Sequence, residues 1–483
     1  MSDRTASSTV DVDPSDEGHE PGRPDLPGVP SGRSDEHDDL PRGRFFRWLV
    51  VIALGALVAR VAYILVFKRD EPAIGDAIYY ANQAIRLAEG RGFVHPFDGG
   101  PAADHPPLTA LTMAPVAWVF GTSLLAQRLA MAVIGTLTVA GIGILGRTVS
   151  GRGRVGLLAA GLAAVYPNLW LNDGVVMSES IATLTIVGVF LTLYRAQGRY
   201  TVGRLAVIGA LCGVAILARA ESAFLLPFVV LPTVWFTGDR SRWQRLGVVA
   251  VAGVCAVAVV VPWSAYNITR FEKPVLLSTN DGLTILGANC DTTYYGDGVG
   301  LWSFACPFTV PITTPPPVHE GCVPEPDDAW SCADQSEVAA AFRTAGIDYV
   351  LNHKQRFPIV AAARVGRIWG VYAPGQMVAY SEGDLATTGE GREGWASWWG
   401  WVMWWAMVPA SVYGAVLLHR RGRMVLPLVM TAVVITVTAV AFYGLVRFRV
   451  PAEVAVVVLA AAALDAVLRR RREGQEAGSV APS

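Results

Sequence analysis

The stretch GDAIYYANQAIRLAEGRGFVHPFDGGPAADHPPL, residues 75–108, directly follows a long apolar segment that ends near Phe67. It opens on an acidic residue, Asp76, continues with apolar residues at helical spacing, and closes on Asp104 and His105 beside two prolines. Carboxylates and a histidine just outside the first span of a membrane protein are costly unless they face water or a site. The stretch is therefore predicted to be an outer loop that carries chemistry.

The composition is that of a membrane protein. Of the 483 residues, 52% are hydrophobic and 16% are charged, whereas soluble domains carry about 25% charged residues. The formal net charge of -1 averages over unlike parts, and nothing in the sequence points to a nucleic acid as partner. Residues 1–42 are rich in Asp, Glu, Pro, Gly and Ser and have almost no large apolar residues, which predicts a disordered cytoplasmic tail.

Apolar segments that alternate with basic turns predict an all-α polytopic fold with about 10–12 spans. A span needs about 20 apolar residues, and short loops rich in Lys and Arg stay in the cytoplasm. Spans at 45–67 and 124–146 put residues 68–123 outside, and the apolar piece 106–121 is then expected at the outer interface without crossing. The other predicted spans are 155–171, 180–197, 205–219, 223–237, 246–263, 400–418, 424–446 and 452–468.

This assignment of spans and loops predicts a multi-pass protein of the plasma membrane with both termini in the cytoplasm. An N-terminal transmembrane module at 43–263 precedes an extracytoplasmic loop domain of mixed structure at 264–398. C-terminal transmembrane helices at 399–469 and a cytoplasmic tail at 470–483 follow. Six tryptophans between 395 and 405 mark the outer interface, because tryptophan concentrates at membrane–water boundaries.

Four of the six cysteines share the expected loop domain. They are Cys290, Cys306, Cys322 and Cys332. In an oxidising compartment they would form two disulfides, with three pairings open. Zinc is the rival interpretation, but the spacing is wide and no CxxC occurs, so disulfides are favoured. The stretch 357–372 carries two arginines at helical spacing and is either an amphipathic helix on the outer leaflet or a packed helix of the loop domain.

The predicted spans place ionisable residues from distant loops on the outer face of the membrane. They are Asp76, Asp104, His105, Asp173, Glu179, Arg219, Glu221, Arg447 and Arg449. Ionisable groups at membrane depth mark functional sites or buried pairs. For Asp173 and Glu221 an ordinary solvated loop residue is an equally good interpretation. Arg60, inside the first span, is interpreted as a structural ion pair or a snorkelling side chain.

Several short motifs follow one another in a characteristic order. They are Gly75-Asp76-Ala77 with Tyr79-Tyr80, Leu87-Ala88-Glu89-Gly90-Arg91-Gly92-Phe93, His105-Pro106-Pro107-Leu108, Tyr166-Pro167, Met177-Ser178-Glu179, and Arg447-Phe448-Arg449-Val450-Pro451. In this order they resemble the GT-C superfamily of membrane glycosyltransferases, in particular the protein O-mannosyltransferase and aminoarabinose transferase group. The resemblance covers residues 45–235 and returns at 440–455. It places no motif in the loop at 264–398.

The resemblance implies a GT-C-like helical bundle that moves a sugar from a polyprenyl phosphate to an acceptor hydroxyl, with inversion, on the extracytoplasmic face. Asp76 would be the general base, and Glu179 and His105 would orient the acceptor or Asp76. The leaving phosphate would be supported by Arg447, Arg449 and Arg219. Further candidates for substrate contact are Tyr79, Tyr80, Asp104, Asp173 and Glu221. No cofactor is certain, and a divalent metal on Asp104, His105 and Glu179 is left open.

Other classes of protein also fit parts of the pattern. A transporter or flippase of a lipid-linked envelope precursor would collect charges in a cavity too, but such proteins usually show internal repeats, and no convincing repeat is found. A non-catalytic scaffold would leave the carboxylates without a purpose. The expected partners are the polyprenyl-phosphate sugar, membrane lipid, and an envelope glycan, lipid or protein as acceptor. The sequence leaves the sugar and the acceptor open.

Overall fold

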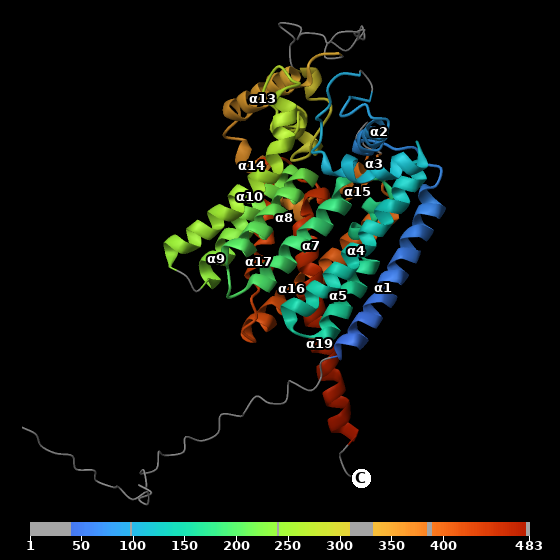
Figure 1. The fold of residues 1–483 in the computed structure, drawn as a ribbon, viewed down its shortest axis with the longest axis vertical. Coiled ribbons are helices and arrows are strands. Elements are labelled where there is room, and N and C mark those ends of the chain that lie inside the picture. The colour runs from blue at the N-terminus through green and yellow to red at the C-terminus, as the bar shows by residue number, and fades with distance from the viewer. Residues whose placement is uncertain (1–39, 97–98, 239–240, 310–331, 384–388, 480–483) are drawn as a thin grey trace, which may run out of the picture. The chain divides into compact units, whose positions relative to one another are not determined.

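The computed structural model describes residues 40–479 except 97–98, 239–240, 310–331 and 384–388. Within these residues every regular element is a helix, and the only β-type backbone pairing is an isolated bridge between Val94 and Pro101. The all-α fold expected from the sequence is confirmed (Figure 1). The tail predicted at residues 1–42 lies almost wholly outside the described residues.

Seven segments in the described part are long and apolar enough to cross a membrane. They are α1 (Arg42–Tyr63) with η1 (Ile64–Lys68), α4 (Leu124–Ser150), α7 (Ser178–Ala196), the run of η3 (Ala220–Phe224), η4 (Leu226–Val230) and α9 (Leu231–Thr237), α10 (Arg242–Ile268), α16 (Gly394–Arg420), and η7 (Val446–Arg449) with α19 (Val450–Ser479). An eighth is bent by 75° where α5 (Gly153–Val165) meets α6 (Pro167–Trp170) and η2 (Leu171–Gly174). The protein is thus a multi-pass membrane protein.

All ten predicted spans coincide with helices, but two of them are too short to count as full spans. One is α8 (Val202–Ala218), whose 17 residues reach about 25 Å against a hydrocarbon core of about 30 Å. The other is divided into α17 (Leu426–Val429) and α18 (Thr431–Ala441). The apolar piece expected at the interface is α3 (Leu108–Phe120), whose 13 residues would reach only about 20 Å.

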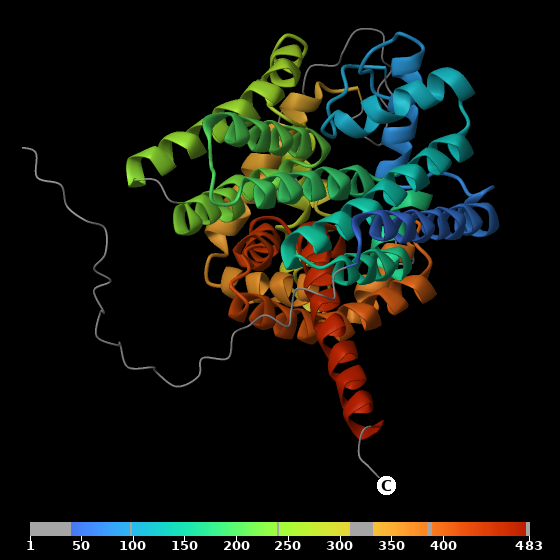
Figure 2. The ribbon, with the colours of Figure 1, turned by 60° about the horizontal axis from the view of Figure 1, so that its bottom comes forward.

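α19 forms the centre of the bundle. It packs on α16, α5, α4 and α7, and its apolar residues between 450 and 463 are buried (Figure 2). The contact with α16 is close at Gly414, because a Cβ there would lie 1.9 Å from the carbonyl oxygen of Leu459. Small residues allow helices to approach in this way inside a membrane, where packing rather than the hydrophobic effect holds helices together.

Gly414→Ala is therefore expected to destabilise the protein by about 1–3 kcal/mol, because the new methyl group meets backbone that can move only with the whole helix. The measurement is the midpoint of thermal unfolding in detergent. Gly161→Ala in α5 is the matched control, since nothing lies within 4 Å of a Cβ at that position. Equal midpoints for the two variants would contradict the close α16–α19 contact.

The two segments predicted outside the membrane lie at the same end of the bundle. α2 (Asp76–Ala88) and α3 lie there, as do α13 (Gln335–Asn352) and α14 (Phe357–Trp369) of the expected loop domain (Figure 1). The C-terminal end of α19 lies at the opposite end. The smaller elements of the loop domain are α11 (Asn280–Gly287), α12 (Asp291–Tyr294), η5 (Gly296–Gly298), η6 (Pro307–Thr309) and α15 (Pro374–Glu382).

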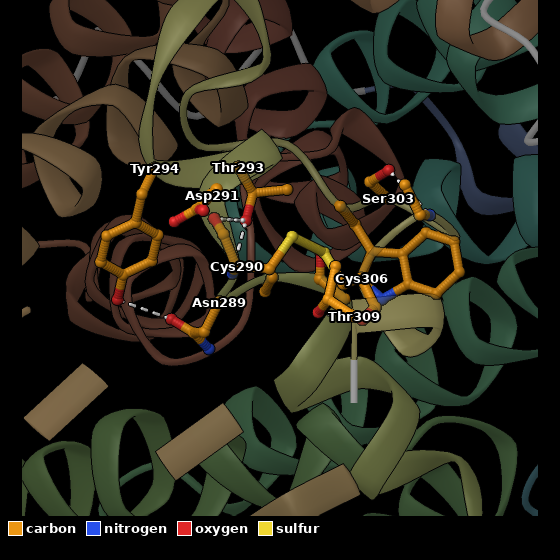
Figure 3. Close-up of a disulfide and its surroundings, with 12 residues drawn as sticks. Asn289, Cys290, Asp291, Thr293, Tyr294, Ser303, Cys306 and Thr309 are labelled. Atoms are coloured by element: carbon orange, nitrogen blue, oxygen red, sulfur yellow. Dashed lines mark hydrogen bonds between the residues drawn. A yellow bond between two sulfur atoms is a disulfide. The ribbon is translucent and has the colours of Figure 1, made fainter. Parts of the chain in front are cut away.

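A disulfide between Cys290 and Cys306 ties the start of α12 to the segment before η6, with 5.6 Å between the two Cα atoms (Figure 3). Cys332 is disulfide-bonded as well, whereas Cys322 lies outside the described residues. The two arginines of α14 are buried and donate to carbonyl oxygens, Arg364 to Ala288 and Arg367 to Val299. These contacts decide between the two interpretations of 357–372 in favour of a packed helix.

Candidate active site

Asp76 is the first residue of α2, where its carboxylate faces the positive end of the helix dipole. The preceding Gly75 has φ +55°, a conformation that favours glycine, and a Cβ there would lie 3.1 Å from the carbonyl oxygen of Gly389. Gly75 thus lets the outer loop turn into α2 against the end of the loop domain. The Asp76 side chain is 28% exposed, so a substrate can reach it.

The guanidinium group of Arg447, in η7, is surrounded by three carboxylates. Its Nη2 lies 2.5 Å from Oδ2 of Asp76, its Nε 3.0 Å from Oε1 of Glu179, and its Nη1 3.4 Å from Oε1 of Glu390. Asp76 and Arg447 are separated by 371 residues in the sequence. The segment that follows the first membrane helix and the one that precedes the last therefore meet at a single charged cluster.

A second arginine extends this cluster. Arg219, at the end of α8, lies 2.6 Å from Glu179 Oε1 and also pairs with Glu221. Its Nη1 donates to Ser178 Oγ at 3.1 Å. Glu179 is fully buried between the two arginines, so it holds them in place and has no surface left for an acceptor.

His105 occupies the other side of Asp76. Its Nε2 lies 3.6 Å from Oδ1 of Asp76, and its ring lies 4.9 Å from that of Tyr80 and 5.1 Å from that of Tyr79. Burial raises the pKa of both tyrosines above the usual range, so they stay neutral. His105 therefore lies between the carboxylate and an aromatic wall.

The charges around Asp76 fix its protonation state. Burial alone would raise the pKa of its carboxyl group, but Arg447 and, to a smaller extent, His105 favour the ionised form. The net pKa of Asp76 lies below the usual range. Asp76 is therefore ionised at neutral pH, as a proton acceptor must be.

Three of the candidates from the sequence have other partners. Asp173 forms a buried ion pair with Arg60 at 2.8 Å, in a space that Gly135 leaves open. Arg449 pairs with Glu453 at 2.6 Å and lies over the ring of Trp404. The Asp104 carboxylate lies 4.0 Å from Nε2 of His95. In the described residues no three His, Cys, Asp or Glu side chains form a metal-binding group, so Asp104, His105 and Glu179 do not gather as one.

Two residues of the cluster were missed by the sequence reasoning. Glu390 and Arg392 come from the end of the loop domain and pair with each other at 3.1 Å. Arg392 also donates to Asn172 Oδ1 at 2.6 Å, while Glu390 contacts Arg447. The signal was present in the sequence, since Gly389-Glu390-Gly391-Arg392 puts two charges between glycines directly before the tryptophan cluster.

A cavity of about 370 Å³ adjoins the cluster. It lies between the loop at 68–77 and the segment at 389–393, and its lining includes Ile74 and Ala77, which flank Asp76, as well as Glu390. Charged side chains of both signs line it, among them Lys68 and Arg128. A cavity of this size is in the range of small-molecule sites, and the charged side chains in its lining can hydrogen-bond a ligand rich in hydroxyl groups.

The resemblance to GT-C membrane glycosyltransferases that was expected from the sequence is confirmed by similarity to known proteins. The sequence profile of the family described as dolichyl-phosphate-mannose-protein mannosyltransferase matches residues 104–266. This range includes His105, Glu179 and Arg219 but neither Asp76 nor Arg447.

Known proteins resemble this chain in sequence or in structure. The polyprenol-phosphate-mannose–protein mannosyltransferase of Corynebacterium glutamicum is 31% identical over 142 residues, which are 28% of this chain and 25% of that protein. The chain thus spans about a quarter of this curated relative. The oligosaccharyltransferase of Archaeoglobus fulgidus has a similar fold, with a TM-score of 0.51 and 14% identity over 92% of this chain and 53% of that one. ArnT from Cupriavidus metallidurans has a TM-score of 0.43, with 16% identity over 86% of this chain and 78% of that one.

Proposed function

We propose that this protein is an inverting glycosyltransferase that takes a sugar from a polyprenyl-phosphate donor and attaches it to an acceptor hydroxyl. The observation that carries the proposal is the contact between Asp76 and Arg447, at 2.5 Å, because it joins a partly exposed carboxylate to the cation that such a reaction needs. The donor class is supported by the names of the matching family and of the Corynebacterium glutamicum relative.

In the proposed reaction the acceptor oxygen attacks the anomeric carbon of the sugar while Asp76 takes the hydroxyl proton. The bond between that carbon and the phosphate oxygen breaks, and its electron pair leaves with the polyprenyl phosphate. Attack from the face opposite the leaving group inverts the configuration at carbon. The leaving phosphate is a weak base, so a cation suffices to support it and no strong general acid is required.

The structure adds a condition to this scheme, because each nitrogen of Arg447 already faces a carboxylate. A phosphate that binds Arg447 would therefore compete with these carboxylates for the cation. If the phosphate takes the place of Asp76 beside Arg447, Asp76 loses the cation that most favours its ionised form. The pKa of Asp76 then rises, so Asp76 becomes a stronger base when the donor is present. Arg219 is the second phosphate candidate, and Arg449 is bound to Glu453 instead.

We assign the reaction to the extracytoplasmic face of the plasma membrane. This assignment is supported by the two ends of the helical bundle. One end carries α2, α3, α13 and α14, and α19 ends at the other (Figure 1). The four arginines at 469–472 near the end of α19 are expected in the cytoplasm, as is the N-terminal tail. The adjoining cavity of about 370 Å³ is the proposed place for the sugar.

The test is a transfer assay in membranes that contain the protein. Polyprenyl phosphate carrying a radiolabelled sugar is supplied with envelope proteins and glycans, mannose being the first sugar because the family and the relative are named for it. Label is expected to pass to an acceptor that resists extraction with organic solvent. If the label crosses the bilayer but stays on the lipid, the protein moves the precursor and the proposed transferase activity is wrong.

A further inference from the structure

A second group of arginines lies where the loop domain meets the start of α16. Arg367 of α14, Arg392 and Arg449 line one cavity of about 30 Å³ together with Ser397 and Trp401. No Asp or Glu is among the lining residues that the structure describes. All three arginine side chains are at least nine-tenths buried. A cavity lined by three buried cations and no acid favours an anion.

The hydrogen bonds of these arginines leave donors available. Arg367 uses Nε and Nη2 on the carbonyl oxygens of Val299 and Asp297, but its Nη1 meets only the sulfur of Met377 at 3.9 Å, a weak acceptor. The Nε of Arg392 and the Oγ of Ser397 have no hydrogen-bond partner among the described residues. Such groups are costly to bury unless something pairs with them.

Charge compensation around the cavity is incomplete. Arg449 pairs with Glu453 at 2.6 Å and Arg392 with Glu390 at 3.1 Å. Arg367 donates to carbonyl, amide and thioether groups and pairs with no carboxylate in the described part of the chain. Burying a cation without a counter-charge is unfavourable, and an anion in the cavity would remove the penalty.

The size and the position of the cavity narrow the choice of anion. A volume of about 30 Å³ admits the oxygen atoms of one small anionic group but no sugar ring. Ser397 and Trp401 belong to the first two turns of α16, where Trp398 and Trp399 are exposed as in an interfacial belt. Guanidinium groups recognise phosphate oxygens in a forked geometry, and lipid phosphates lie at this depth.

We propose that this three-arginine cavity binds a phosphate group, separately from the reacting phosphate at Asp76. The bound phosphate would join α14, the segment before α16, and η7 by shared hydrogen bonds, and so hold the loop domain to the membrane helices. Its source is either the headgroup of a membrane lipid or free phosphate, since both present the same oxygen atoms. The proposal goes beyond the transferase activity and does not depend on it.

The test measures the thermal unfolding of the full-length protein in detergent with four additions: inorganic phosphate, phosphatidylglycerol, undecaprenyl phosphate, and sodium chloride at matched ionic strength. A ligand that binds only the folded state raises the midpoint. Ser397→Asp places a carboxylate beside the arginines and is expected to weaken phosphate binding roughly tenfold or more. Ser397→Asn introduces a side chain of nearly the same shape as aspartate but without the charge. This variant is expected to keep the stabilisation by phosphate.

A rise with the two lipids alone identifies a lipid headgroup, a rise with inorganic phosphate alone identifies free phosphate, and a rise with all three shows that the phosphate group suffices. The proposal is overturned if none of them stabilises the wild type more than sodium chloride does, if Ser397→Asp responds as the wild type does, or if Ser397→Asn loses the response as well. Asp76→Asn is expected to retain the response, so a failure of the proposed transferase activity is distinguishable from a failure of the cavity.

Discussion

Asp76→Asn is expected to lower sugar transfer by about 10²–10⁴-fold, because an amide of the same shape cannot take the proton from the acceptor hydroxyl. The measurement is the initial rate of label transfer at saturating donor, normalised to the amount of folded protein in the membrane. The loss should fall on kcat, since Asp76 is proposed to act on the acceptor oxygen during the reaction itself. Asp76→Glu is expected to recover part of the rate by returning the carboxylate in a shifted position.

Asp70→Asn is the matched control for this variant. Asp70 lies six positions before Asp76 on the same outer loop, its side chain is 94% exposed, and its nearest cation is Arg69 at 4.0 Å. The same chemical change is expected to leave the rate within about twofold there, because exposed ion pairs contribute little. A wild-type rate in Asp76→Asn would remove Asp76 as the base, whatever the control shows.

Arg447→Lys is expected to lower kcat by about 10²–10³-fold, the usual effect of removing one group that stabilises charge in a transition state. A lysine has a single ammonium group, so it cannot contact Asp76, Glu179 and Glu390 together. Arg91→Lys, with an exposed side chain in the loop that follows α2, is the control and is expected to retain the rate. Equal losses in the two variants would contradict the central place of Arg447.

The pH profile of Arg447→Lys provides an independent readout. Arg447 is the strongest of the charges that lower the pKa of Asp76, and a lowered pKa keeps the carboxylate ionised into acidic solution. Looser contact with the cation raises that pKa, so the acidic limb of activity is expected to move to higher pH in the variant. A limb that stays in place while kcat falls would show that Arg447 serves the phosphate alone and does not tune Asp76.

The all-helical architecture was predictable because each span appears in the sequence as a continuous apolar run between basic turns. The same local signal does not show where a helix is interrupted, which is why the break between α17 and α18 within 424–446 was not predicted. The loop domain was less predictable, since α14 hides Arg364 and Arg367 against carbonyl oxygens, and buried arginines look like exposed ones in a sequence.

The charged cluster was predictable only in part. Asp76, His105, Glu179, Arg219 and Arg447 were nominated by sidedness and by family resemblance, and they lie together. The pairing of Asp173 with Arg60 was beyond the sequence, because the pattern cannot orient the first span toward Asp173. Arg449 and Glu453 are four residues apart where η7 meets α19, so helical spacing could have indicated their pairing. Glu390 was missed although its segment alternates charged residues with glycines, because this pattern does not indicate which residue Glu390 contacts; the contact with Arg447 gives it its place in the cluster.

The span of 371 residues between Asp76 and Arg447 has a consequence for biosynthesis. The carboxylate leaves the ribosome early, whereas its arginine is made just before the final membrane helix. A nascent chain therefore lacks this ion pair throughout nearly all of its insertion into the membrane, and under the proposed mechanism it cannot transfer sugar in the meantime. Synthesis of residues 447–483 completes the ion pair, so under the proposed mechanism a chain that terminates before Arg447 is expected to show no transfer.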